Sequence, residues 1–456
     1  MHAKDSCSRL LKLVLAGLVL CASVAAQQKP TVLRGGKLLT VTHGTIENGV
    51  LIIENGKIAA VGAANSVKIP KDSRVIDVSG MTVYPGLIDS ETQLGLTEIQ
   101  EEEMTNDFIE PSDEIMPHMH VYDAFHAESE LIPVTRYNGI TNAIVAPGSR
   151  DTLPGQDSFV QLAGKTQQDF LLVRDIAMPL NFSGEQRRNQ GGFERRKFPS
   201  TRMGLAAQLR QVFLDAQDYG QKWTDYEKKK TEYEKSQSNE AAKASSKPDD
   251  KDKKQPPTPP KHDLKLEALL PYLQGKKLVV LGAEQANDLQ TAVGLAHEFN
   301  LKFVLNHISH SQSVLDYVAN LHVPVIVGPV YEAPRPEERY DAVYSLPAQL
   351  NKRGVKIAFA SYDAHNSRNL PYQAGFATAF GLPYDEALKA ITISAAEIWG
   401  VADTLGSLDV GKTANVVVAN GDPLDMKTDV KQVFIEGKEI AMKNRQTELR
   451  DRYWNQ

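Results

Sequence analysis

The feature that most constrains the fold is an alternation of short apolar runs and amphipathic segments in the middle of the chain. Runs at residues 277–281, 303–305, 323–327 and 356–360 have the length and composition of buried strands. Helix-spaced apolar residues separate them: Leu289, Ala292, Val293 and Ala296 after the first run, and Val314, Tyr317, Val318 and Leu321 after the second. Repeated βα units of this length predict an α/β fold with a parallel sheet, closed as a barrel or open.

Both ends of the 456-residue chain are instead typical of short strands joined by tight turns. Apolar runs at 50–54 and 57–61 flank the pair Asn55-Gly56, which suits the positive φ angles of a two-residue hairpin turn. Near the other end, the runs at 415–419 and 433–437 have the same character. The two ends are therefore predicted to pair into one small β domain.

These patterns predict a composite β domain, residues 27–84 with 405–446, and an α/β domain at 85–404 whose parallel sheet is a barrel or open. Residues 236–262 interrupt the α/β domain with interleaved lysine and aspartate followed by a proline-rich run, and large apolar side chains are absent. Such a stretch buries too little surface to offset the entropy lost on ordering. It is predicted to be a disordered insertion.

Residues 1–26 are typical of an export signal. Lys4, Arg9 and Lys12 precede an apolar run at 13–20, and small residues follow at 24–26, where a signal peptidase would cut. The apolar run is too short to span a membrane as a helix, and no later segment replaces it. We therefore expect a protein without a transmembrane segment, exported to the periplasm or the cell exterior.

Charge and cysteine content narrow the chemistry. The chain has 51 basic and 57 acidic side chains, a formal charge of −6, so a nucleic-acid partner is not expected. Both cysteines, Cys7 and Cys21, lie in the predicted signal segment. A metal in the mature protein would therefore have to be held by histidine, carboxylate, backbone or water.

Several ordered motifs carry a family resemblance. The most specific is Pro85-Gly-Leu-Ile-Asp89 followed by Ser-Glu-Thr-Gln at 90–93. The others are Gly139-Ile-Thr141, Ala146-Pro-Gly-Ser149, Ala387-Leu-Lys-Ala-Ile-Thr392, Ala395-Ala-Glu-Ile-Trp-Gly400, Leu405-Gly-Ser-Leu-Asp-Val-Gly-Lys412 and Gly421-Asp-Pro423. Together they resemble the metal-dependent amidohydrolase superfamily, especially its imidazolonepropionase-like members, in which the first barrel strand ends in Pro-Gly-(Leu/Phe)-Ile-Asp-x-His-x-His.

The resemblance implies a (β/α)8 TIM-like barrel with a composite β-sandwich built from both chain ends. It also implies an active site at the carboxyl ends of the barrel strands. In active relatives, histidine and carboxylate side chains there hold one or two divalent ions that lower the pKa of water. An aspartate on the last strand then moves the proton, and by position that aspartate is Asp363.

Most of the ligands that the resemblance implies are replaced. Glu91 and Gln93 stand where the family has the paired histidines of the first strand, and Glu284 stands where relatives usually place another histidine. His307 does occupy the position of a later metal-ligating histidine, and Asp363 lies where the last-strand aspartate is expected. The family's two-metal site is therefore expected to be lost, because its most specific donors are absent.

Two interpretations of the remaining residues stay open. In the first, four donors bind one divalent ion, Zn, Mn or Fe, with Asp363 also as the catalytic residue: Glu91, Glu284, His307 and Asp363. In the second, no metal is bound, and Glu91 and Gln93 are hydrogen-bonded polar residues of a cavity. Under either interpretation His310 and His365 are predicted to line the same pocket.

A second His-x-His pair, His118 and His120, lies some 30 residues beyond the first barrel strand. On a strand, the two imidazoles would point to one face. The segment around them is rich in proline and acidic residues and has no strand pattern before it. The pair is predicted to be two hydrogen-bonded loop histidines rather than metal ligands.

The motifs thus predict an exported hydrolase that acts on the C–N bond of a linear or cyclic amide, with an altered or weakened metal site. The alternative is a catalytically inactive family member that keeps the barrel as a binding or assembly module. Such a protein would form a homo-oligomer or pair with an active homologue. Fold does not decide between the two hypotheses, because the activity depends on the ligands that this chain has replaced.

Overall fold

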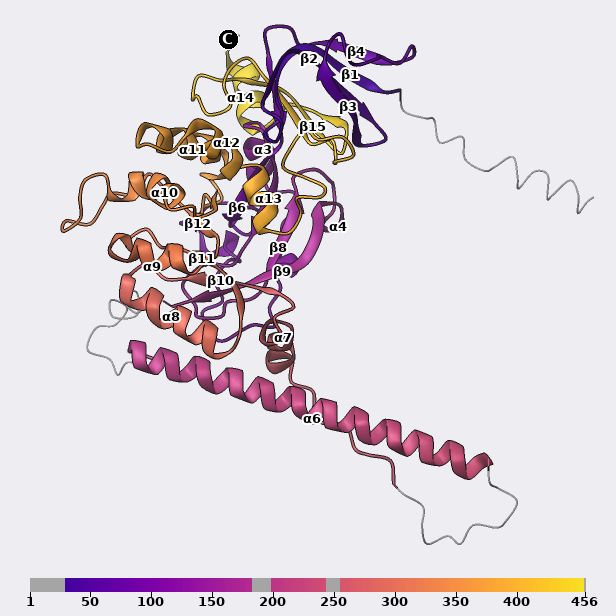
Figure 1. Ribbon diagram of the computed structural model, residues 1–456, viewed down its shortest axis with the longest axis vertical. Helices are drawn as coiled ribbons and strands as arrows, with labels where there is room; N and C mark the ends of the chain where they lie inside the picture. Colours follow the sequence, from indigo (N-terminus) through magenta and orange to yellow (C-terminus); the bar gives the residue numbers. More distant parts are fainter. Residues whose placement is uncertain (1–28, 183–197, 243–254, 455–456) are drawn as a thin grey trace, which may run out of the picture.

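A computed structural model describes residues 29–182, 198–242 and 255–454. The predicted signal segment, residues 1–26, and part of the predicted insertion, residues 243–254, lie outside these ranges. Within these ranges, no helix has both the length and the apolar character needed to cross a membrane. Figure 1 shows a β domain at one end, a barrel with its helices in the middle and one long helix at the other end.

Strands from both chain ends form the β domain. They are β1 (Thr31–Leu39), β2 (Thr45–Glu54), β3 (Lys57–Ala63), β4 (Arg74–Asp77), β5 (Thr82–Pro85), β14 (Val416–Ala419), β15 (Val430–Ile435) and β16 (Lys438–Ile440). The two ends meet where β14 pairs with β5 in antiparallel orientation. The predicted hairpin is confirmed, since β2 and β3 pair around Asn55 (φ 51°) and Gly56 (φ 77°).

The resemblance implies a sandwich, whereas the structure joins all eight strands into one hydrogen-bonded sheet, in the order β16-β15-β14-β5-β1-β2-β3 with β4 beside β1. The register of β1 against β2 shifts on both sides of Gly36. Such bulges bend a strand, and here the first half of β1 pairs with β4 and the second half with β5. A separate hydrophobic cluster of this sheet includes Leu33, Leu51, Val416 and Phe434.

The middle of the chain forms a nearly closed barrel of eight strands. They are β6 (Leu87–Thr92), β7 (Ile140–Val145), β8 (Asp157–Gln161), β9 (Leu171–Asn181), β10 (Leu278–Gly282), β11 (Lys302–Asn306), β12 (Val325–Val327) and β13 (Ile357–Phe359). The four apolar runs that the sequence places in the middle of the chain are confirmed as β10 to β13, each parallel to the next.

The barrel departs from the predicted (β/α)8 pattern at β8, which is antiparallel to both β7 and β9. Parallel neighbours need a crossover of a dozen or more residues, usually a helix, whereas antiparallel neighbours need only a short link. The links on either side of β8 contain only the four-residue helix α4 (Gln167–Phe170). The chain therefore runs up, down and up through β7, β8 and β9.

Asp89 closes the barrel between its first and last strands. The carboxylate is fully buried and accepts hydrogen bonds from Ser361 N (2.9 Å), Ser361 Oγ (2.6 Å) and Ser367 Oγ (2.7 Å). Burial raises the pKa of Asp89 to about 7, although these donors favour the ionised form. The backbone adds a bond from Tyr362 N to Glu91 O (2.9 Å). The aspartate of the most specific family motif is thus a structural residue here.

Helices surround the barrel (Figure 1). Besides α4 they are α2 (Val121–Ala124), α3 (Leu131–Arg136), α6 (Arg202–Ala242), α7 (Leu264–Leu273), α8 (Ala286–Glu298), α9 (Leu315–Asn320), α10 (Ala342–Lys352), α11 (Leu370–Ala379), α12 (Tyr384–Ala390) and α13 (Ile393–Ile398). The last helix, α14 (Arg445–Tyr453), lies beside the β domain (Figure 1). Single 3-10 turns are η1 (Glu103–Thr105), η2 (Gln312–Val314) and η3 (Ser367–Asn369). The predicted helices after β10 and β11 are α8 and α9.

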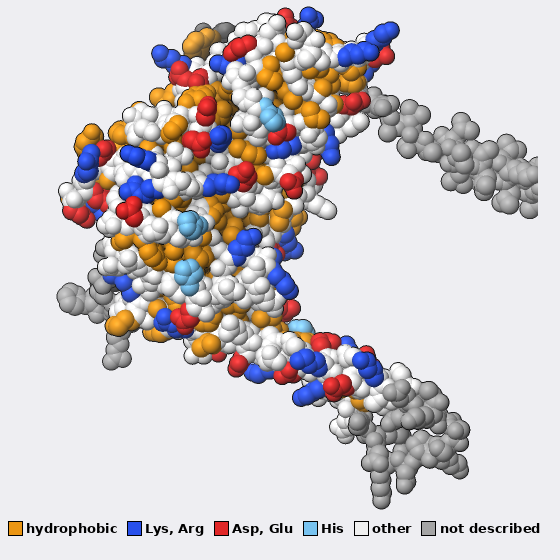
Figure 2. Space-filling model, in the orientation of Figure 1, with side chains coloured by type: hydrophobic (Ala, Val, Ile, Leu, Met, Phe, Trp, Pro, Cys, Tyr) orange, Lys and Arg blue, Asp and Glu red, His pale blue; other side chains and the backbone are white. Residues whose placement is uncertain are grey.

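The first half of α6 packs on the barrel helices, and the second half projects from the molecule (Figure 1). Leu205, Leu209 and Phe213 are buried at helix spacing, and the Phe213 ring meets Phe299 at 5.0 Å between centroids. Figure 2 shows Lys, Arg, Asp and Glu side chains along the projecting part. Because α6 continues to Ala242, it includes the first residues of the insertion predicted at 236–262.

Candidate active site

Three strands bring the candidate site together at their carboxyl ends. Glu91 is near the end of β6, Asn306 ends β11 with His307 directly after it, and Tyr362 follows β13. Because the carboxyl ends of these parallel strands meet at one end of the barrel, residues far apart in the sequence become neighbours. Glu91 is 6% exposed and Asn306 1% exposed.

Glu91, Asn306, His307 and Tyr362 form a connected cluster, which we call the mouth cluster. The Asn306 amide donates to Glu91 Oε2, and the Tyr362 hydroxyl donates to Asn306 Oδ1. His307 Nε2 lies 3.4 Å from Glu91 Oε1, and the His307 and Tyr362 rings pack with their centroids 4.4 Å apart. Both oxygens of the Glu91 carboxylate therefore face nitrogen groups of the cluster.

Two residues of the mouth cluster have strained backbones. His307 has φ 53° and Tyr362 has φ 54°, in the left-handed region that favours glycine. For residues with bulky side chains this conformation costs of order 1–3 kcal/mol each, and it persists only where the surroundings impose it. His307 directly follows β11, and Tyr362 lies close to the end of β13. The left-handed backbone conformation at these two positions orients both rings towards Glu91 and towards each other.

Electrostatics favour a protonated His307. Burial by itself would lower the pKa of the imidazole, but the Glu91 carboxylate opposes this effect, with smaller contributions from Glu284 and Glu332, and the pKa is raised above its usual value. Burial and the charge of Glu91 together raise the pKa of Asp157, at the start of β8, well above its usual range. These shifts favour an imidazolium–carboxylate pair of His307 and Glu91 and favour the neutral form of Asp157.

We expect the pKa of His307, measured by NMR titration, to lie above the model-peptide value of about 6.5. In Glu91→Gln it should fall below that value, because burial then acts without the opposing carboxylate. Glu338→Gln is the matched control, since Glu338 contacts His310 (2.9 Å) rather than His307. A His307 pKa that is unchanged in Glu91→Gln would contradict the ion pair.

A cavity of about 280 Å³ lies beside the mouth cluster. Its lining includes His307, His310, Glu284, Ser309 and Glu332. Acidic and imidazole groups thus surround a space that holds only a small molecule, just below the usual range of about 300–1,000 Å³ for ligand pockets.

The other residues predicted for the site have separate partners. Glu284 reaches this cavity, but its carboxylate lies 3.4 Å from Arg335 Nη2. The Asp363 carboxylate accepts from Gln100 Nε2 (2.8 Å) and from the backbone N–H of Asn366 (2.7 Å), so it holds a loop turn together. Gln93 is buried near the end of β6, and His365 lies half-buried in the loop after Asp363.

The pair His118 and His120 lies elsewhere, around a different cavity. His120 Nδ1 is 2.7 Å from Asp175 Oδ1, which makes it a hydrogen-bonded histidine beside the start of α2. Burial lowers the pKa of His118, which favours its neutral form.

Three residues of the site were not predicted from the sequence: Asn306, Tyr362 and Asp157. Asn306 directly precedes His307, but its role as the link between Glu91 and Tyr362 depends on the distance between β6, β11 and β13. Asp157 starts a strand that was not predicted, and its Oδ1 has no hydrogen-bond partner in the described part of the chain. A polar residue at the first position of an apolar run, in Asp157-Ser-Phe-Val-Gln161, is the one signal that the sequence offers.

Comparisons with known proteins agree with this architecture. Residues 304–440 match the Amidohydrolase family. An amidohydrolase from Thermotoga maritima MSB8 is similar in structure, with a TM-score of 0.76 and 25% sequence identity, over 91% of this chain and 100% of that one. The chain resembles amidohydrolases over nearly its whole described length.

Two further relatives show how far the likeness extends. Amidohydrolase tasK of Hapsidospora irregularis is 23% identical over 409 residues, which cover 85% of this chain but 39% of that protein. The chain thus spans about two fifths of the length of that relative. An imidazolonepropionase from Bacillus cereus is 49% identical, but over 53 residues only. The imidazolonepropionase-like subtype therefore stays a prediction.

Amidohydrolases are generally metal-dependent, which raises the question of whether the residues of the mouth cluster could hold a metal ion. In the described ranges, no three His, Cys, Asp or Glu side chains come together in a group that could hold an ion. Only two of the four predicted ligands, Glu91 and His307, contact each other. The other two, Glu284 and Asp363, have separate partners. Glu91 Oε2 already accepts from the Asn306 amide, and His307 Nε2 lies 3.4 Å from Glu91 Oε1. The residues present do not fit the predicted metal.

Proposed function

We propose that this protein hydrolyses the C–N bond of a small amide at the mouth of the barrel, with the His307–Glu91 pair in the place of a metal. The observation that carries the proposal is the pair itself, 3.4 Å apart, beside a cavity at the strand ends where barrel enzymes have their active sites. The similarity to amidohydrolases supports hydrolysis as the class of reaction.

The chemistry follows from the charges of the pair. Hydrolysis of an amide adds hydroxyl to the carbonyl carbon and a proton to the departing nitrogen, which leaves poorly unless it is protonated. Water adds to the carbonyl carbon first, and imidazolium then donates a proton to the nitrogen of the tetrahedral adduct as the C–N bond breaks. Glu91 keeps the imidazole protonated until that transfer. The neutral imidazole then accepts the proton left on the added oxygen, which restores the pair and balances the reaction.

The cavity limits the substrate. About 280 Å³ accommodates a small amide or lactam rather than a peptide chain. The acidic side chains of Glu284 and Glu332 at its wall favour a neutral or cationic substrate over an anionic one.

The experiment is a hydrolysis screen over small linear and cyclic amides, with release of the amine as the readout. Wild type is compared with the double variant Glu91→Ala, His307→Ala. We expect turnover in the wild type and none in the double variant. Equal turnover in both would exclude the mouth cluster from the reaction.

A catalytically inactive barrel that binds a ligand or a partner chain is the second candidate. The observation in its favour is that much of the mouth cluster is already engaged, because Glu91 Oε2 accepts from the Asn306 amide and Asn306 Oδ1 accepts from the Tyr362 hydroxyl. This candidate requires a defined oligomer or a stable partner in light scattering of the purified protein, together with no hydrolysis in the screen. A monomer that turns over amides contradicts it.

A further inference from the structure

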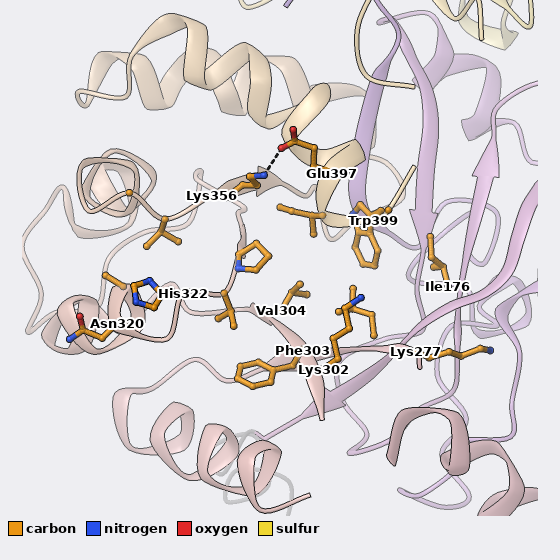
Figure 3. Close-up of a pocket in the computed structure, with 18 of the residues that line it drawn as sticks. Ile176, Lys277, Lys302, Phe303, Val304, Asn320, His322, Lys356, Glu397 and Trp399 are labelled. Atoms are coloured by element: carbon orange, nitrogen blue, oxygen red, sulfur yellow. Dashed lines mark hydrogen bonds and ion pairs between the residues drawn. The ribbon is translucent and has the colours of Figure 1, made fainter. Parts of the chain in front are cut away.

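A larger cavity, of about 710 Å³, lies at the opposite end of the barrel from the mouth cluster (Figure 3). Its lining includes Leu278 and Lys302, which begin β10 and β11, and Lys356, which precedes β13. Asn306, at the other end of β11, belongs to the mouth cluster. Because these strands are parallel, the cavity is at their amino ends, and no part of the mouth cluster lines it. We call it the basal cavity.

The lining of the basal cavity is strongly cationic. Its charged members are five cations, Lys276, Lys277, Lys302, Arg353 and Lys356, and one carboxylate, Glu397. The chain as a whole has more acidic than basic side chains, so the concentration of cations here is local. A concave surface lined by charges of one sign attracts ligands of the opposite sign.

Two of the five cations have no ion-pair partner in the described part of the chain. Lys356 pairs with Glu397, Arg353 with the exposed Asp316 at 2.7 Å, and Lys277 lies 3.8 Å from Asp175. In the ranges that the structure describes, no carboxylate forms an ion pair with Lys276 or Lys302. Two ammonium groups are thus available to an anion.

The inner wall of the basal cavity is apolar. Trp399, directly after α13, is 5% exposed and packs on the side chains that fill the barrel. Figure 3 shows its ring among the side chains that line the cavity, with Val304 and Ile176 between it and other parts of the wall, and Phe303 farther along the same cavity. The indole N–H has no hydrogen-bond acceptor in the described part of the chain.

We propose that the basal cavity binds a small organic anion, with an acidic group, carboxylate, sulfonate or phosphate, attached to a planar apolar body. The acidic group contacts Lys302 and Lys276 at the rim, and the apolar body packs against Trp399 and Phe303. The volume lies within the range of about 300–1,000 Å³ that ligand pockets occupy. This site is separate from the mouth cluster and does not depend on amide hydrolysis.

The test uses 1-anilinonaphthalene-8-sulfonate, a fluorescent probe with a sulfonate on an aromatic body, and its uncharged analogue N-phenyl-1-naphthylamine. Wild type should bind one sulfonate probe per chain saturably. Its affinity for the uncharged analogue should be lower by about tenfold or more. Lys302→Glu and, separately, Lys276→Glu should each weaken binding of the sulfonate by about tenfold. Both lysines are exposed, so neither change disturbs the core.

Lys438→Glu is the matched control, an exposed lysine on β16 in the β domain. It should bind the sulfonate as wild type does. A variant with Trp223→Phe and Trp454→Phe retains Trp399 as the single tryptophan, and its emission should be quenched on saturation. Equal affinity for the two probes, wild-type affinity in both lysine variants, or unquenched Trp399 emission would each overturn the proposal.

Discussion

Replacing Asp89 by alanine is expected to lower the free energy of unfolding by about 3–5 kcal/mol. Three donors, Ser361 N, Ser361 Oγ and Ser367 Oγ, bond the buried carboxylate at 2.6–2.9 Å. Alanine leaves Ser361 N and Ser367 Oγ without this acceptor, whereas Ser361 Oγ keeps a second one, Asp363 O at 3.0 Å. Each buried unsatisfied group costs about 1–3 kcal/mol. The loss also opens the junction between β6 and the end of β13.

The measurement for this prediction is urea unfolding followed by circular dichroism, with Asp77→Ala as the control. The Asp77 carboxylate also accepts two hydrogen bonds, from Ser79 N (2.9 Å) and Ser79 Oγ (2.6 Å), but it is exposed. Water replaces the lost acceptor there, so the control should differ from wild type by less than about 1 kcal/mol. Equal stabilities of Asp89→Ala and Asp77→Ala would contradict the role of Asp89 in closing the barrel.

Replacing His307 by glutamine is expected to lower kcat for amide hydrolysis by about 10²–10⁴-fold, the usual contribution of a positioned general acid. Glutamine keeps a hydrogen-bonding group near Glu91 but supplies no titratable proton. The change should act on kcat more than on KM, because the proton is transferred in the transition state rather than in the bound substrate.

Asp363→Asn separates this mechanism from the one that the family resemblance implies. The Asp363 carboxylate accepts hydrogen bonds from Gln100 and Asn366 N and has a structural role. The Asp363→Asn variant should therefore keep a kcat within about tenfold of the wild-type value, far above the kcat of His307→Gln. A loss in Asp363→Asn as large as that in His307→Gln would instead support Asp363 as the catalytic base.

Much of the fold could be predicted from local patterns. Strands β10 to β13 are short buried runs separated by helices with one apolar face, and Asn55-Gly56 has the backbone freedom that its turn requires. The orientation of β8 was not predictable, because strand direction depends on the length and path of its links. The exposed first half of β9 also obscures the apolar run that would mark a barrel strand.

The candidate site was predictable only where position in the chain fixes position in space. Glu91 and His307 were correctly placed at the ends of barrel strands, since strand ends meet at one face of the barrel. Their pairing, and the link through Asn306 to Tyr362, depend on side-chain distances between strands that no single segment encodes. Glu284 and Asp363 also follow barrel strands, but their carboxylates bond to Arg335, and to Gln100 and Asn366 N.

The role of the His307–Glu91 pair in the place of a metal can be tested most directly by measuring amide hydrolysis and metal content on the same protein, purified without chelators and measured again after dialysis against a chelator. We expect turnover with metal far below one ion per chain and no change on chelation or on addition of Zn, Mn or Fe. Near-stoichiometric metal whose removal abolishes turnover, and which is absent from the Glu91→Ala, His307→Ala variant, would contradict it.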